Sequence, residues 1–194
     1  MNVFIVYCHP DEDSFTRLIR DSFIDGLKSS GYGCVISDLY KMNFTSEMNR
    51  DEYRREAHYR IELPVPDDVL IEQEKINSSD AVAFIYPLFW SDVPAKLKGW
   101  FDRVWTFGFA YGENRTMKLL EKALVLVSAG NTLDYFEKTG IGEAMKKIML
   151  DDRLFDRVKH KEMFIFEATS RETDARELNR EKHLRKAFEL GKNF

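Results

Sequence analysis

Five short, mostly apolar runs recur along the chain, and most are followed by apolar residues repeated at helical spacing. The runs suit strands buried in a sheet, and they lie at 2–7, 33–37, 81–86, 123–127 and 163–168. Helical spacing, with capping or helix-ending residues at its limits, predicts helices at 15–31, 67–77, 94–104, 141–150 and 173–191. The alternation predicts an α/β protein with one parallel sheet.

Five strands separated by helices favour a doubly wound, flavodoxin-like sheet in the order 2-1-3-4-5, with helices on both faces. We expect one domain over residues 1–194, because the chain shows neither internal repeats nor low-complexity linkers. One long polar connection, 38–66, carries a modest helical stretch around Tyr53. In this strand order the carboxyl ends of strands one, three and four meet at one edge, where such sheets bind ligands.

The stretch 81–104 has the clearest pattern at that edge. Its strand leads into an aromatic turn, and Pro94 suits the first turn of the helix that follows. The turn consists of Pro87, Leu88, Phe89 and Trp90. An apolar turn at this place predicts a flat wall for a planar ligand.

The loop after the first strand leads into a helix, which predicts an anion site. The free N–H groups and the dipole of a helix N-terminus attract anions, and the hydroxyls of Ser14 and Thr16 are placed to donate to a phosphate. The alternative is that Asp11, Asp13 or Ser14 only caps the helix. Acidic side chains at 11–13 would repel a phosphate unless they point outward. The loop is neither GxGxxG nor a Walker A sequence, so a dinucleotide fingerprint and an NTPase site are both unsupported.

Two further loops extend the predicted site. The fourth strand ends in a small-residue turn at 128–132, which lets a ligand approach the backbone closely. The aromatic and glycine-containing loop 106–112 suits a pocket or an interface, with a loop tucked under its own side chains as the alternative. A phosphate site beside a broad apolar wall describes a flavin better than a nucleoside triphosphate, because no lysine or carboxylate is placed for magnesium.

The composition is that of an ordinary globular protein, with 44% hydrophobic and 32% charged residues. The net charge is -4 and basic residues are interspersed with acidic ones, which argues against nucleic acid or an anionic membrane as the main partner. No apolar run approaches the ~20 residues of a membrane span, so we expect a cytoplasmic protein. The two cysteines suit free thiols, and the four histidines lack metal-ligand spacing.

These segments resemble the NAD(P)H:quinone oxidoreductase family of flavodoxin-fold flavoproteins. That family includes general stress protein 14, the modulators of drug activity and the ancillary subunits of potassium efflux systems. The resemblance rests on YCHPDEDSFT at 7–16, on the stretch 72–112 and on SAGN at 128–131. Its most specific part runs from PLFW to KGWFDRV, and after about residue 150 only the general pattern remains.

The resemblance implies which residues would hold a flavin, FMN or alternatively FAD. The flavin phosphate would be contacted by His9, Ser14, Phe15 and Thr16. The aromatic turn from Pro87 to Trp90 would lie along the isoalloxazine, next to a turn formed by Ser128, Ala129, Gly130 and Asn131. The resemblance also implies a flavin contact from Gln73, in the helix before the third strand.

Two tyrosines complete the implied site. Tyr111 falls where the family contributes a pocket aromatic across a dimer interface. Tyr135 aligns, across a one-residue gap, with a tyrosine that manages charge on the reduced flavin, so we expect it to be a catalytic proton donor. Two departures concern the pocket, because Ser91 stands where mammalian members have a second aromatic and Ser128-Ala129 has one hydroxyl fewer than the usual turn.

The implied activity is a two-electron, ping-pong reduction of quinones, or of related nitro and azo compounds, by NAD(P)H in a homodimer. One alternative is a flavin-binding regulatory subunit of a membrane potassium-efflux transporter. Another is a one-electron carrier of the flavodoxin type. The mild acidity of the chain and the lack of the phosphate loop of true flavodoxins argue against the carrier.

Overall fold

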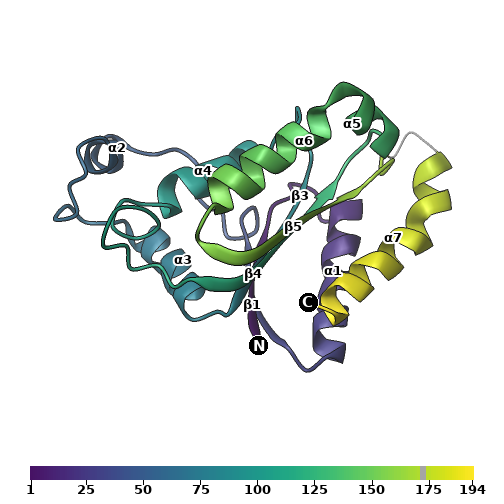
Figure 1. The fold of residues 1–194 in the computed structure, drawn as a ribbon, viewed down its shortest axis with the longest axis horizontal. Coiled ribbons are helices and arrows are strands. Elements are labelled where there is room, and N and C mark those ends of the chain that lie inside the picture. The colour runs from purple at the N-terminus through teal and green to yellow at the C-terminus, as the bar shows by residue number, and fades with distance from the viewer. Residues whose placement is uncertain (171–173) are drawn as a thin grey trace.

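The computed structural model describes residues 1–170 and 174–194. Its middle layer is a sheet in which neighbouring strands run parallel, in the order β2-β1-β3-β4-β5 (Figure 1). The strands are β1 (Asn2–Tyr7), β2 (Gly33–Asp38), β3 (Ala81–Pro87), β4 (Leu120–Ser128) and β5 (Val158–Phe166). The predicted class, the parallel pairing and the strand order are confirmed.

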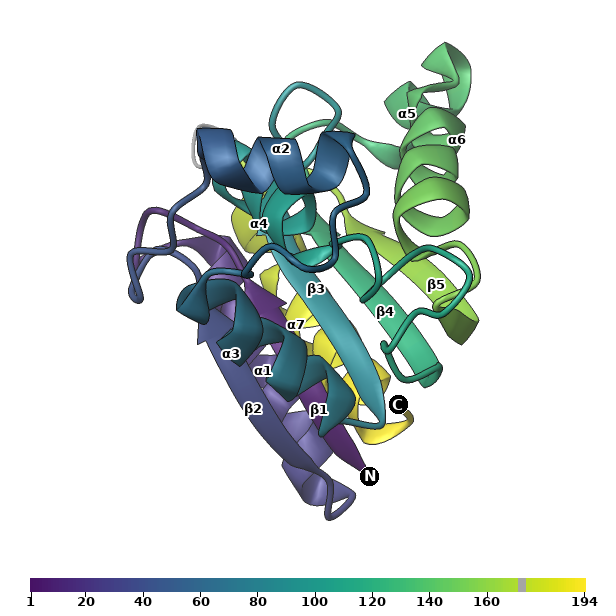
Figure 2. The same cartoon turned by 90° about the vertical axis from the view of Figure 1, so that its left-hand side faces the viewer.

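Helices cover both faces of this sheet, as predicted. One face carries α1 (Phe15–Ser29) and α7 (Asp174–Lys192), which Figure 1 shows side by side. The other face carries α3 (Asp67–Asn77), α4 (Ala95–Val104) and α6 (Ile141–Lys146). The long connection contains α2 (Arg50–Ala57), which lies above α3 in the upper left part of Figure 2. Two further elements, α5 (Leu133–Thr139) and the π-helix η1 (Lys147–Leu154), flank α6.

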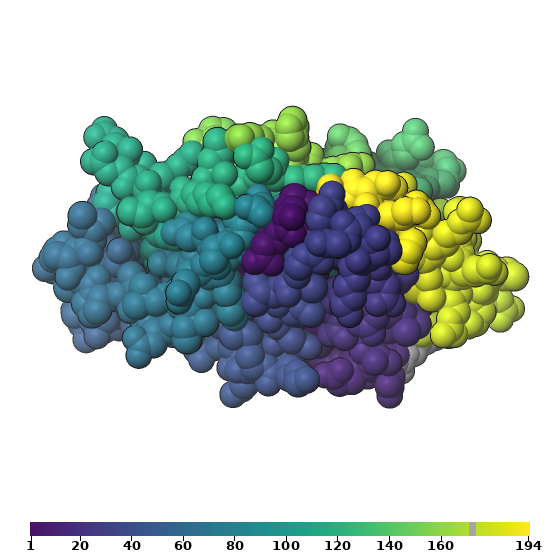
Figure 3. Space-filling view, turned by 90° about the horizontal axis from the view of Figure 1, so that it is seen from below, coloured from purple at the N-terminus to yellow at the C-terminus, as the bar shows by residue number. Residues whose placement is uncertain are grey.

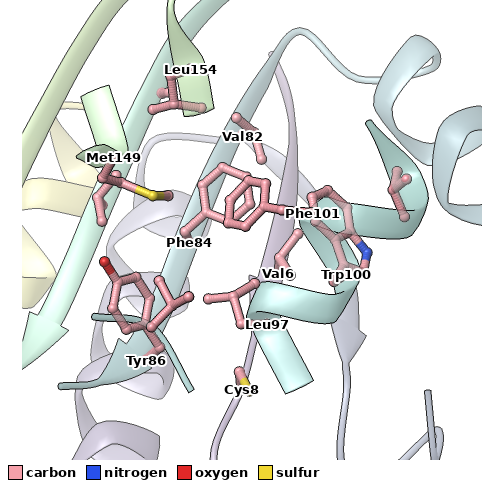
Figure 4. Packing of buried hydrophobic residues seen from close by; sticks show 14 of the residues in the cluster. Val6, Cys8, Val82, Phe84, Tyr86, Leu97, Trp100, Phe101, Met149 and Leu154 are labelled. Atoms are coloured by element: carbon pink, nitrogen blue, oxygen red, sulfur yellow. The ribbon is translucent and has the colours of Figure 1, made fainter. Parts of the chain in front are cut away.

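The packing of α4 against β3 forms the centre of the core. All seven residues of β3 are buried, as expected of a strand covered on both faces. The Phe84 ring centroid lies 5.7 Å from that of Trp100 and 5.0 Å from that of Phe101 (Figure 4). Leu97 and Val104 are buried on the same side of α4. The helical spacing of the sequence therefore identified the buried face of this helix correctly.

Several element boundaries differ from the predicted ones. The predicted helix 141–150 consists of α6 followed by η1, which extends it to Leu154, and α5 was not predicted. The fourth strand begins at Leu120, and the fifth begins at Val158 and ends at Phe166. Pro66, not Asp67, occupies the N-cap of α3, and no side chain caps this helix. Thr173, the predicted cap of the last helix, lies outside the described residues.

The last helix is held tightly against α1. A Cβ added to Gly26 would lie 2.1 Å from the Phe188 carbonyl oxygen, and one added to Gly191 would lie 2.1 Å from that of Phe23. Figure 3 shows the end of α7 lying against the region of α1, and there the Ser30 hydroxyl donates to the carbonyl of Lys192. Glycine at both positions therefore permits the two backbones to touch.

The loop 106–112 turns most of its aromatic surface inward. Phe109 is buried, and Phe107 and Tyr111 are half-buried and pack edge to face with centroids 5.5 Å apart. This packing agrees with the alternative of a loop tucked under its own side chains, although Tyr111 also lines a pocket. Both cysteines are free thiols. Cys8 follows the carboxyl end of β1, and Cys34 of β2 lies opposite Val3, near the start of β1.

Within the part of the chain that the structure describes, none of the helices has the length and apolar character required to cross a bilayer.

Candidate functional site

A cavity of about 250 Å³ opens at the carboxyl edge of the sheet. Its walls come from the loop after β1, the start of α1, the ends of β3 and β4, residues 169–170 after β5, and the first turn of α7. The lining residues are His9, Asp11, Ser14, Phe15, Thr16, Pro87, Leu88, Ser128, Gly130, Thr169, Ser170 and Arg176. Parallel strands direct their carboxyl ends to one edge, so three turns far apart in the sequence meet here.

The start of α1 is built as predicted for an anion site. Ser14 is the N-cap, and its Oγ accepts the N–H of Arg17 at 3.1 Å. It also lies 3.3 Å from the hydroxyl of Tyr7, whose pKa burial raises to about 12. The capping alternative is thus true of Ser14, but the cap leaves the first-turn amides of Phe15 and Thr16 without intrahelical partners. Capping and anion binding are compatible at this helix end.

Of the acidic residues of this loop, Asp11 lines the cavity, whereas Glu12 and Asp13 do not. Asp11, Glu12 and Asp13 are exposed. The carboxylate of Asp11 accepts the N–H of Asp13 at 2.9 Å, which stabilises the turn of the loop. The Nδ1 atom of His9 accepts the N–H of Asp11 at 2.9 Å, so the proton of the neutral ring is on Nε2.

A hydroxyl pair joins two walls of the cavity. The Oγ1 of Thr16 lies 2.7 Å from the Oγ of Ser128, which connects the start of α1 to the end of β4. The N–H of Leu88 donates to the carbonyl of Ser128 at 2.8 Å, which connects the end of β3 to the same residue. The carbonyl of Ala129 accepts from the N–H and the hydroxyl of Thr169, both at 3.0 Å. These bonds fix the relative positions of the three turns.

Arg176, on the first turns of α7, brings a positive charge to the cavity. Its guanidinium lies 5.3 Å from the centre of the Phe15 ring. Its Nε is buried and, among the residues that the structure describes, has no hydrogen-bond partner, since the carboxylate of Glu177 lies 3.8 Å away, beyond hydrogen-bond distance. A buried donor without an acceptor is costly unless a ligand supplies one, so this atom favours an anion in the cavity.

The aromatic turn after β3 is partly inside and partly outside the cavity. Pro87 and Leu88 line it, whereas Phe89 and Trp90 do not. The side chain of Trp90 is fully exposed, at 102%, and the residue has φ 49°. Full exposure of a tryptophan is unusual for a residue of this size and leaves its face available to a planar ligand.

The other predicted site residues lie away from the cavity. The side-chain amide of Gln73 is buried in α3 and donates to the carbonyl of Val104 at 3.1 Å and to the hydroxyl of Thr106 at 3.0 Å. Tyr111 lines a different cavity and donates from its hydroxyl to Glu56 Oε2 at 2.9 Å. Tyr135 lies on α5 and is half-exposed. Ala129 and Asn131 flank Gly130 and contact neighbouring segments through their backbone atoms. The N–H of Ala129 donates to the carbonyl of Phe166, and the carbonyl of Asn131 accepts the N–H of Ala168.

Sequence reasoning missed three residues of the cavity, namely Thr169, Ser170 and Arg176. The two hydroxyl residues follow β5, so the rule that ligands bind at strand carboxyl ends would have identified them had it been applied to the last strand. Arg176 has no comparable signal, because one arginine in a charged helix is ordinary in a sequence. Its position depends on the crossing of α7 over α1.

The residues of the cavity fit the phosphate end of FMN. The α1 amides, the Thr16 hydroxyl and the guanidinium of Arg176 are donors, and the buried Nε of Arg176 has no hydrogen-bond partner in the described part of the chain. Pro87 and Leu88 continue from this polar end as an apolar wall, and the exposed Trp90 follows them outside the cavity. The donor set and the wall together match a ligand with an anionic end and a planar body.

Comparisons with known proteins agree with this geometry. A family model described as flavodoxin-like fold matches residues 1–190. The solved NAD(P)H:quinone oxidoreductase from Methanothermobacter marburgensis is 46% identical, with a TM-score of 0.93, and the match covers 100% of this chain and 96% of that chain. General stress protein 14 from Treponema denticola, solved in complex with FMN, shares the fold with a TM-score of 0.70 and 19% identity, over 100% of this chain and 99% of that chain.

A curated relative is the human ribosyldihydronicotinamide dehydrogenase (quinone). It is 36% identical over 157 residues, which cover 72% of this chain and 68% of the human protein. The chain spans about two thirds of the length of the curated relatives it matches.

Proposed function

The chain belongs to the flavodoxin-like fold family, and on that premise we propose that it is a flavin-dependent NAD(P)H oxidoreductase that reduces quinones or related nitro and azo compounds. The observation that carries the proposal is the cavity that joins a phosphate-type site to an apolar turn at the switch edge of the sheet. The identity of 46% to the Methanothermobacter enzyme over the whole chain supports it.

FMN is the proposed cofactor, held by residues at both ends of the cavity. The amides at the start of α1 and the hydroxyl of Thr16 bind its phosphate, and Arg176 neutralises part of the phosphate charge. Pro87 and Leu88 would lie against the planar part, and the exposed side chain of Trp90 would be available to cover one side of it. When bound, FMN supplies the capacity to accept a hydride from NAD(P)H and to deliver two electrons to an acceptor.

The protein contributes positioning and polar contacts rather than the redox chemistry itself. The backbone N–H groups near Trp90 and Gly130 are the proposed donors to the ring carbonyls, where negative charge develops on reduction. Tyr135 is the candidate proton donor, because α5 begins directly after the turn that contains Gly130 and the Tyr135 side chain is half-exposed.

A second copy of the chain is the proposed partner. Tyr53, Tyr59 and Ile61, on α2 and the turn after it, each expose more than 60% of their side-chain surface. Apolar side chains gathered on one segment suit burial in an interface. Regulation of a membrane transporter stays a prediction from the resemblance, and co-purification of a transporter from membranes is the measurement that tests it.

Initial-rate kinetics test the proposed function. We expect purified protein supplied with FMN to oxidise NADH or NADPH with a quinone as acceptor, and reciprocal plots at several quinone concentrations should be parallel, as a ping-pong reaction requires. Free FMN at the same concentration is the control. Turnover no faster than that of free FMN with quinone, nitro and azo acceptors alike would refute the proposal.

A further inference from the structure

The turn between β3 and α4 contains two consecutive residues in the left-handed region. Trp90 has φ 49° and Ser91 has φ 64°. Phe89 and Asp92 flank them in an antiparallel bridge, with N–O distances of 3.1 and 3.0 Å. A two-residue turn with positive φ at both central positions strongly prefers asparagine and glycine, so tryptophan and serine carry a steric cost here. Such a conformation persists only where the surroundings impose it.

An ion pair with a residue of η1 imposes this turn conformation. Arg153, in η1, donates from both terminal nitrogens to Asp92, with Nη1 at 2.7 Å from Oδ1 and Nη2 at 3.0 Å from Oδ2. The same carboxylate accepts the N–H of Val93 at 2.7 Å. Burial by itself raises the pKa of Asp92, but the hydrogen bonds from Arg153 and Val93 outweigh it and lower the pKa. The carboxylate is therefore ionised at neutral pH, and its bidentate geometry fixes the last residue of the turn.

Arg153 is itself rigidly placed. Its side chain is only 8% exposed, and its guanidinium lies 5.5 Å from the centre of the Phe101 ring on α4. Its carbonyl accepts the indole N–H of Trp105 at 2.7 Å. The residue lies in a π-helix, a rare element that occurs frequently at functional sites. These contacts hold the guanidinium in place, so it restrains Asp92 rather than following it.

We propose that Arg153 is a positioning residue that, through Asp92, locks the Trp90–Ser91 turn in its strained form and so presents the flavin wall before the cofactor binds. The inference rests on the proposed function for the identity of the ligand. The other end of the turn is already fixed, because the N–H of Leu88 donates to Ser128 across the cavity. With Arg153 at the far end, the turn is held at both ends, and binding of FMN requires little further ordering of the loop.

The test uses the full-length protein and two measurements. In Arg153→Met, we expect faster backbone hydrogen exchange over residues 89–93 without FMN, and FMN binding weakened by about 10-fold, the effect of losing a charged hydrogen-bonded pair. Arg115→Met is the matched control, because it removes an arginine paired with Asp156 elsewhere on the surface, and it should change neither measurement.

Removal of the strain distinguishes positioning from a purely structural ion pair. Glycine adopts positive φ without steric cost, so Arg153→Met with Ser91→Gly should recover part of the lost exchange protection and FMN affinity. A structural pair would lower the melting temperature without such recovery. If Arg153→Met does not fold, Asp92→Asn removes the charge from the exposed side of the pair, and the same changes are expected.

Unchanged exchange over residues 89–93 in folded Arg153→Met or Asp92→Asn would overturn the inference. Failure of the proposed function gives a different result, because wild-type protein would then bind no FMN. The exchange measurement would still show whether the Arg153–Asp92 pair restrains the turn.

Discussion

At the scale of single residues, Arg176 supplies a positive charge to the candidate site. Its buried Nε has no hydrogen-bond acceptor within residues 1–170 and 174–194, and its guanidinium packs over Phe15 at the start of α1. Replacement by methionine keeps an apolar stem against the ring but removes the charge, so Arg176→Met should weaken FMN binding by about 10-fold or more. Flavin fluorescence titration measures the change.

The control for this prediction is Arg180→Met, one turn further along α7, where the arginine is exposed and pairs only loosely with Glu177. Its affinity for FMN should match that of the wild type. Equal FMN affinities for the Arg176 and Arg180 variants would contradict the assignment of Arg176 to the phosphate site.

The two thiols should differ in reactivity for a physical reason. Burial raises the pKa of Cys8 to about 12, which leaves about one part in 10⁴ as the reactive thiolate at pH 8. Cys34 is partly exposed, so it alone should react with an aromatic disulfide reagent in the native protein, and Cys8 should react only after denaturation. Rapid modification of two thiols per native chain at pH 8 would show that Cys8 is not protected.

At the scale of elements, a buried arginine explains how the long connection is held in place. Arg103 on α4 donates through Nε to Glu52 on α2 at 2.7 Å, and through Nη2 to Asp68 on α3 at 3.0 Å. It also donates to the carbonyl of Thr45 at 2.8 Å. One side chain thus ties α2, α3 and the start of the connection to the helix that packs on β3.

Loss of this arginine should therefore be costly. Removing one partner of a buried pair leaves an unpaired charge, so Arg103→Met should lower the free energy of unfolding by about 3 kcal/mol. Lys98→Met on the same helix is the control, because the exposed pair of Lys98 with Asp102 contributes only about 0.3–0.5 kcal/mol. Urea unfolding measures both, and a similar loss in the two variants would mean that the Arg103 network does not hold the connection.

The elements themselves differed in how far the sequence predicted them. The strand and helix of 81–104 were predicted closely, because an unbroken apolar run and a Pro-started helix are strong local signals. The π-helix was not predicted, since π-helices are rare and no residue pattern used in the prediction distinguishes one from an α-helix. Helix α5 is short and half-exposed, so its apolar periodicity is weak, although Thr132 does cap it.

At the scale of the whole molecule, the sheet order explains why part of the site was predictable. The alternation of strands and helices favoured the order 2-1-3-4-5, and in that order the turns after β1, β3 and β4 share one edge. Eight of the residues predicted to contact a flavin lie in those turns and line the cavity, as this rule leads one to expect: His9, Ser14, Phe15, Thr16, Pro87, Leu88, Ser128 and Gly130. The contribution of α7 depends on how it crosses α1, which no local pattern encodes.

Assembly is also a property of the whole molecule. The side chain of Ile61 is 64% exposed in the apolar group after α2, so we expect a homodimer that Ile61→Glu shifts towards the monomer by placing a charge in the interface. Light scattering at micromolar concentration measures the mass. Leu178→Glu, at an 83% exposed position on α7, should leave the mass unchanged. A wild-type monomer, or equal shifts in the two variants, would refute the proposed interface.

The central claim is that the cavity at the carboxyl edge holds FMN, and the cofactor released from purified protein tests it most directly. Protein purified in the presence of excess FMN and FAD, then freed of unbound flavin, should release FMN at close to one per chain on denaturation, identified by mass spectrometry. Release of FAD, of another nucleotide or of no flavin would contradict the account.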